Sequence, residues 1–157
     1  MSDPHQLAAD VLVGSEVPAE HEPAIIEAFR AVGVAARVRM VPTRRGVEEL
    51  PWLVLATLPL QAFLTGLGVV IAEDVTQRMK RLVGRVLRAR RAHPPAAQLL
   101  VLQDADTRLQ VVLESDLPPE AYQSLPALDL SQFRHGPLRY DRQLARWRSE
   151  LDEANRS

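Results

Sequence analysis

The residues that could perform acid–base or metal chemistry are few and scattered. Asp104 and Asp106 are close enough in the sequence to act as a general acid and base. They stand in the segment Asp104-Ala-Asp106-Thr107, whose residue types are typical of a turn, so we interpret them as turn residues. No histidine has a second ligand three or four residues away in a predicted helix, so neither a metal ion nor another cofactor is expected. The histidines are His5, His21, His93 and His135.

Two short glycine motifs have residue types that occur in nucleotide or catalytic sites. Gly66-Leu67-Gly68 lies within a helical pattern instead of directly after a strand, so close packing of that helix explains it better than a phosphate site. Gly14-Ser15-Glu16 follows a predicted strand but contains neither a nucleophile elbow nor a phosphate cradle. We therefore predict no catalytic residue and do not expect an enzyme.

Basic residues are concentrated in the segment 78–91, which contains no acid. At spacings of three and four, Arg78, Arg81, Arg85 and Arg88 share one face of a helix and could bind phosphate. No aromatic residue is interleaved for base stacking, and the net charge of -1 argues against a general polyanion binder. Arg81, Arg85 and Arg88 are therefore candidate partner-binding residues, and nucleic-acid binding remains an alternative, as does a merely solvated face.

The first part of the chain predicts a β-α-β unit. The apolar run Asp10 to Gly14 indicates a buried strand, and Pro18 to Val32 has helical spacing with Gly33 as its C-terminal cap. Val34 to Val41 alternates between apolar and basic residues, as a half-exposed strand does. A crossover of this length makes the two strands parallel.

The middle of the chain predicts a second set of elements. Trp52 to Thr57 indicates a buried strand, and the apolar stripe from Gln61 continues at helical spacing towards Arg91. The runs Gln98 to Gln103 and Arg108 to Glu114 indicate a hairpin, and a short helix follows from Leu117 to about Leu125.

The order β-α-β-β-α-β-β-α predicts an α+β fold with two layers. About five strands form a mixed sheet, which two main helices cover on one face. We expect one domain over residues 1–125, followed by a linker and a charged C-terminal helix over residues 126–157.

The C-terminal segment, Pro137 to Asn155, is predicted to be that helix. Its apolar residues form one narrow stripe between charged positions, which is typical of a docking surface. The stripe can instead pack on the open face of the protein's own sheet. Its residues are Tyr140, Leu144, Trp147 and Leu151.

The uncharged run from Leu50 to Ala72 is long enough for a membrane span, and the basic segment after it suits a cytoplasmic flank. Against a span, the run contains Pro51 and Pro59, and its helical stripe continues beyond the first charges. The chain has no cysteine, and its first residues lack the basic and apolar regions of a signal peptide. A cytoplasmic location is therefore expected.

The order and residue composition of these elements resemble those of the effector-associated constant component family of bacterial conflict systems. The resemblance covers residues 10–115. Its parts include the strand Asp10 to Gly14, the acidic start of the first helix, the strand ending Val38-Arg-Met-Val41-Pro42, the run Trp52 to Thr57, the small-residue helix with a basic end, and the hairpin Leu99 to Glu114. It implies a non-enzymatic adaptor that works beside a sensor or effector, such as a caspase-like peptidase.

Three hypotheses follow from the sequence. The first is an adaptor or scaffold that binds a protein partner through the tail stripe and the basic helix end. The second is a single-span membrane component through Leu50 to Ala72, and the third is a nucleic-acid-binding accessory protein through residues 78–91.

Overall fold

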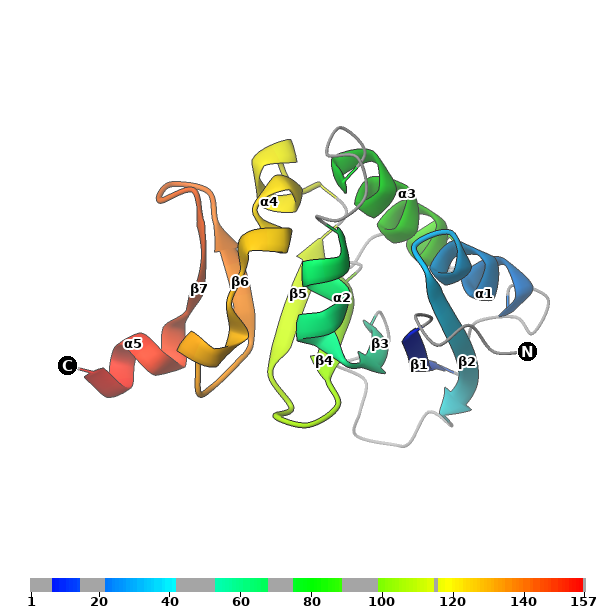
Figure 1. Cartoon of the computed structure of the whole chain (residues 1–157), viewed down its shortest axis with the longest axis horizontal. Coiled ribbons are helices and arrows are strands. Elements are labelled where there is room, and N and C mark those ends of the chain that lie inside the picture. Colours follow the sequence, from blue (N-terminus) through cyan, green and yellow to red (C-terminus); the bar gives the residue numbers. More distant parts are fainter. Residues whose placement is uncertain are drawn as a thin grey trace.

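A computed structural model describes residues 7–14, 22–41, 53–67, 75–88, 99–114 and 116–156. They form an α+β fold built on a seven-stranded mixed sheet (Figure 1). The predicted class is therefore confirmed. The predicted number of strands, about five, is too low because the C-terminal segment adds two.

The first three elements are β1 (Leu7–Gly14), α1 (Glu22–Arg30) and β2 (Val34–Val41). β1 and β2 pair in parallel, as the β-α-β pattern predicted. Gly33 has φ of 82°, a left-handed conformation that favours glycine, and its N–H donates to the carbonyl of Arg30 at 3.0 Å. The glycine therefore ends α1 in the predicted way.

The middle elements are β3 (Leu53–Leu58), α2 (Leu60–Leu67), α3 (Val75–Arg88), β4 (Leu99–Asp104) and β5 (Gln110–Glu114). β4 and β5 pair antiparallel, so the predicted hairpin is confirmed. Helix α2 and helix α3 lie within the predicted long helix, and the residues between them lie outside the described part of the chain.

The glycine at position 66 does not have the packing role that its sequence suggested. Among the described residues, a Cβ atom built on Gly66 would meet no side chain or backbone of another element within 4 Å. No described element therefore approaches closely enough to require glycine there, and Gly68 lies outside the described residues.

The sheet has the strand order β2-β1-β3-β4-β5-β6-β7. One row of paired residues crosses every strand and points to the face that the helices cover. Val11 and Leu102, both fully buried, are in this row, and they join one core with Phe29 of α1, Leu64 of α2 and Met79 of α3. The row is Val38, Val11, Ala56, Leu102, Val111, Leu138 and Ser149.

The opposite face of the sheet is polar at its β2 edge. Arg37 and Arg39 flank Val38 in β2 and therefore point away from the helices. Both arginines are exposed, as is Ala35 on the same face.

The predicted helix from Pro137 to Asn155 is wrong over most of its length. After α4 (Pro119–Gln123) and two 3-10 turns, η3 (Leu125–Ala127) and η4 (Leu130–Gln132), the chain forms β6 (Leu138–Asp141) and β7 (Arg146–Ser149). Only the last segment is helical, as α5 (Glu150–Arg156). β6 pairs in parallel with β5, so the sheet continues across the predicted boundary at residue 125.

The segment predicted to be a linker is anchored to the rest of the fold. The Gln61 side chain of α2 donates to the carbonyl of Leu128 at 3.1 Å and accepts from the N–H of Leu130 at 2.8 Å. Leu130 is buried in the common core. These contacts fix the chain between α4 and β6.

The uncharged run Leu50 to Ala72 contains both strand and helix. Its residues 53–58 form β3, and residues 60–67 form α2. Among the described residues, no helix has the length and apolar character needed to cross a membrane.

Candidate functional site

Helices α1 and α3 lie side by side over the β2 end of the sheet (Figure 1). Each is amphipathic. Helix α1 buries Ile25 and Phe29, whereas α3 buries Met79, Leu82 and Val86. Packing of these apolar faces on the sheet leaves the polar face of α3 in solvent, next to the C-terminal end of α1.

A groove of ≈ 330 Å³ lies between α1 and α3. Its floor includes Ala28 and Leu82, which are buried, and the more exposed Ala31 and Val32. Gln77 lines its α3 side together with three arginines. The arginines are Arg78, Arg81 and Arg85.

Positive charge in this groove is not neutralised within the described part of the chain. Arg81 and Arg85 are exposed, Arg78 is partly exposed, and none of the three has an ion pair or hydrogen bond there. The acid nearest in sequence to the groove wall on α1, Glu27, instead pairs with Arg30 at 3.3 Å. The groove therefore combines a short apolar floor with cationic groups that are available to a negatively charged ligand.

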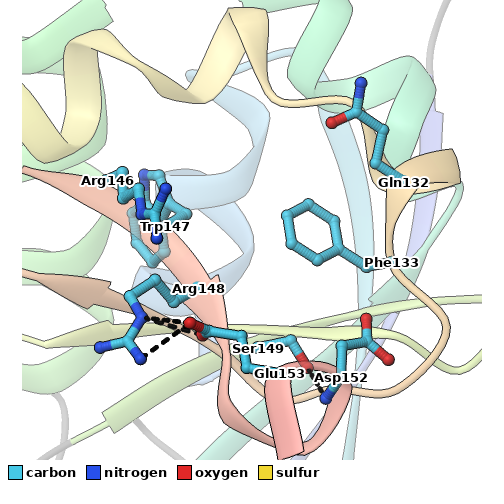
Figure 2. Close-up of a pocket in the computed structure, with 8 residues that line it drawn as sticks. All are labelled: Gln132, Phe133, Arg146, Trp147, Arg148, Ser149, Asp152 and Glu153. Atoms are coloured by element: carbon cyan, nitrogen blue, oxygen red, sulfur yellow. Dashed lines mark hydrogen bonds and ion pairs between the residues drawn. The ribbon is translucent and has the colours of Figure 1, made fainter. Parts of the chain in front are cut away.

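A second hollow, of ≈ 310 Å³, lies between β7, α5 and the segment before β6 (Figure 2). Ser149 caps α5, because its Oγ accepts from the N–H of Asp152 at 3.2 Å. Arg148 points to Glu153, with its Nε 2.9 Å from Oε2, and also pairs with Asp141. The charged side chains around this hollow thus hold β6, β7 and α5 together.

Asp152 and His135 form the most chemically suggestive pair. Asp152 is only 7% exposed, and its carboxylate accepts from the N–H groups of Arg134 at 2.9 Å and His135 at 3.1 Å. Its Oδ1 is also 3.0 Å from Nδ1 of His135, as in the orienting pair of a catalytic triad. The nearby Ser149 hydroxyl, however, donates to the carbonyl of His135 and not to its ring. This arrangement caps and anchors the chain, and it does not activate a nucleophile.

The hydrogen bonds also determine the titration of Asp152. Burial acts to raise the pKa of Asp152, but hydrogen bonds from Arg134 and His135 outweigh it and hold the pKa below its ordinary value. Because the folded pKa is lowered, the carboxylate stabilises the fold above the unfolded pKa. That stabilisation is lost as the pH falls through the folded value.

Asp152→Ala is expected to abolish hydrogen-exchange protection of the Arg134 and His135 amides, because both lose their acceptor. Acidification below the folded pKa of Asp152 should weaken the same protection in the wild type. Amide exchange measured residue by residue tests both. Glu150→Ala, at an exposed acid on the same helix, is the control and should leave these amides protected. Equal exchange in both variants would contradict the anchoring role of Asp152.

Asp104 has a structural role of the predicted kind. Its carboxylate accepts from the N–H of Leu60 at 3.0 Å, from the N–H groups of Asp106 and Thr107 at 3.1 and 2.8 Å, and from the Thr107 hydroxyl at 2.9 Å. It therefore shapes the β4–β5 turn and also caps the start of α2. The side chain of Asp106, in contrast, is exposed. In the described residues, no group of three or more His, Asp or Glu side chains is arranged to hold a metal ion.

The four residues of the predicted tail stripe do not form one surface. Tyr140 and Trp147 pair across β6 and β7, with ring centroids 5.5 Å apart and an angle of 66° between the ring planes. Trp147 is buried, whereas Leu144, in the turn between the strands, and Leu151, on α5, are 53% and 54% exposed. The stripe required a continuous helix, which the hairpin replaces.

The predicted basic face is partly described. Arg81 and Arg85 lie together in the groove, and Arg88 is the last residue of α3, with its side chain outside the described atoms. Sequence reasoning missed the wall formed by Ala31 and Val32, because no local pattern shows which helix packs beside α3. It also missed the capping motif Ser149-Glu-Leu-Asp152, whose spacing is a detectable helix-start signal.

Comparison with known proteins identifies no family for this chain. No family model, curated protein or solved structure matches it. The resemblance to the effector-associated constant component family stays a prediction.

Proposed function

We propose that this protein is a non-enzymatic, cytoplasmic adaptor that binds a protein partner through the groove between α1 and α3. The observation that carries the proposal is the presence of Arg78, Arg81 and Arg85 beside an apolar floor, without an acid partner among the described residues. Surfaces that combine arginine with small apolar areas are suited to protein recognition. The suggested setting, a bacterial conflict system, rests on the family resemblance.

Two further observations support an adaptor over the alternatives. The carboxylates and the histidine with catalytic potential, Asp104, Asp152 and His135, already make hydrogen bonds that hold the fold. None of the described residues that line the groove is aromatic, so they offer single-stranded nucleic acid no stacking platform. Nucleic-acid binding through the same arginines is the alternative that an experiment must separate.

Charge reversal in the groove is expected to remove the protein partner. Arg81→Glu/Arg85→Glu should prevent its recovery when the tagged protein is purified from the cells that express it, because like charges then face its acidic surface. Arg37→Glu/Arg39→Glu is the matched control, since it makes the same change in charge on the opposite face of the sheet. Quantitative mass spectrometry of the retained proteins is the measurement.

The control should retain the partner that the groove variant loses. Recovery of the same proteins with both variants would contradict the proposal. Loss of bound nucleic acid alone, with every protein retained, would favour the nucleic-acid alternative. Circular dichroism of both variants establishes that each one is folded.

A further inference from the structure

The arrangement of the groove also points to the form of its occupant. We infer that the groove accepts an acidic amphipathic helix of the partner, with carboxylates three and four residues apart. This inference rests on the proposed function and adds the class of partner. Three features support it: the spacing of the arginines, the small apolar side chains of the floor, and the location of the groove between two packed helices.

The arginine spacing fits a helical ligand. Arg78, Arg81 and Arg85 follow one side of α3 at intervals of three and four residues, which is a rise of about 4.5 Å and then about 6 Å. Carboxylates at the same intervals on a second helix have the same rise and can face all three arginines. An extended segment places successive side chains of one face about 6.8 Å apart, so its register drifts from that of the arginines.

The floor of the groove favours an amphipathic ligand over a uniformly acidic one. Ala28 and Ala31 have small side chains, which let a helix backbone approach α1 closely, and Val32 offers partly exposed apolar surface. A helix that lies between α1 and α3 would place apolar residues over this floor and acids over the arginines. Helix-in-groove recognition uses this division of one helix into an apolar stripe and a polar flank.

The test uses two synthetic peptides of the same composition and net charge. In the first, cross-linked to hold it helical, three glutamates occur at i, i+3 and i+7 beside an apolar stripe. In the second, also cross-linked, the glutamates are distributed around the helix. Fluorescence anisotropy measures the binding of each to the full chain at low salt, where charge pairing is least screened.

The first peptide should bind about tenfold more tightly than the second, the effect expected of a few exposed ion pairs acting together. Arg81→Glu/Arg85→Glu should remove this preference, and Arg37→Glu/Arg39→Glu should preserve it.

Each other outcome overturns a defined part of the account. Equal binding of the two peptides overturns the amphipathic occupant with carboxylates at these intervals and leaves the proposed function standing. Binding of neither peptide, while a cellular partner still depends on Arg81 and Arg85, has the same meaning. If the groove and control variants act alike on both the peptides and the cellular partner, both proposals fail. If a short oligonucleotide instead displaces the first peptide by binding more tightly, and does so only when Arg81 and Arg85 are present, the occupant is a nucleic acid.

Discussion

Asp104→Ala is expected to lower the free energy of unfolding by about 2–4 kcal/mol, since hydrogen bonds to a carboxylate are strong and buried donors are costly to leave unpaired. The side chain is nearly buried and joins two elements that are distant in the sequence, the start of α2 and the β4–β5 turn. Its loss would leave the N–H groups of Leu60 and Thr107 without this acceptor. Urea denaturation followed by circular dichroism measures the change.

Asp106→Ala is the matched control for Asp104→Ala. Asp106 is in the same turn, but its side chain is exposed, so its removal should change stability by no more than about 0.5 kcal/mol. Similar losses from both variants would show that negative charge in the turn matters and that the hydrogen bonds of Asp104 do not.

The pH dependence of Asp104 has a defined sign. Burial acts to raise the pKa of Asp104, but hydrogen bonds from Thr107, Leu60 and Asp106 outweigh burial and lower the pKa below 3.8. The carboxylate therefore stabilises the fold above that value, and its contribution disappears as the pH falls through the lower folded pKa. The difference in stability between the wild type and Asp104→Ala should shrink over the same range.

Trp147→Ala is expected to destabilise the protein by about 3–5 kcal/mol, the usual result of removing a large aromatic side chain from a core. Trp147 is 6% exposed, packs on Tyr140, and donates from Nε1 to the Ala121 carbonyl at 3.1 Å and to Ser124 Oγ at 3.0 Å. These contacts attach β7 to the segment around α4. Thermal and urea unfolding measure the loss.

Leu144→Ala is the control for Trp147→Ala, since Leu144 is 53% exposed in the neighbouring turn. Its effect on stability should be within about 0.5 kcal/mol. If Trp147→Ala were as stable as the wild type and instead lost a binding partner, the tail would be a docking surface, as the sequence suggested, and its packing described above would be wrong.

The strands and helices before residue 125 could be predicted because their local signals agree. In β2, alternation of Val38 with Arg37 and Arg39 indicates a strand, and Gly33 marks the end of the helix before it. The β4–β5 hairpin was detectable because two apolar runs flank the turn residues Asp104 to Thr107. Pattern and turn chemistry gave the same answer in each case.

The tail was mispredicted because its residues fit both the helical spacing and the alternation of a strand. Tyr140, Leu144, Trp147 and Leu151 fit a helix, while Arg146-Trp-Arg-Ser149 alternates as a strand does. The turn between β6 and β7 contains no glycine, and Ala145 adopts the left-handed conformation there with φ of 55°. Pairing with β5 decides in favour of strands, and that partner is not encoded locally.

The groove was predictable on one side only. Spacing alone brings Arg81 and Arg85 to one face of a helix, but the opposite wall comes from α1, far away in the sequence. Packing of two helices on one sheet creates such a site, and a single sequence does not state which helices are neighbours.

The central claim is that a partner protein occupies the groove between α1 and α3. A photo-cross-linking amino acid at Gln77, which lines the groove, tests it directly in the expressing cells, with the same amino acid at exposed Ala35 on the opposite face as the control. We expect a discrete protein adduct from position 77 that is absent from position 35 and is lost with Arg81→Glu/Arg85→Glu. The absence of an adduct at position 77, or equal adducts at both positions, would contradict it.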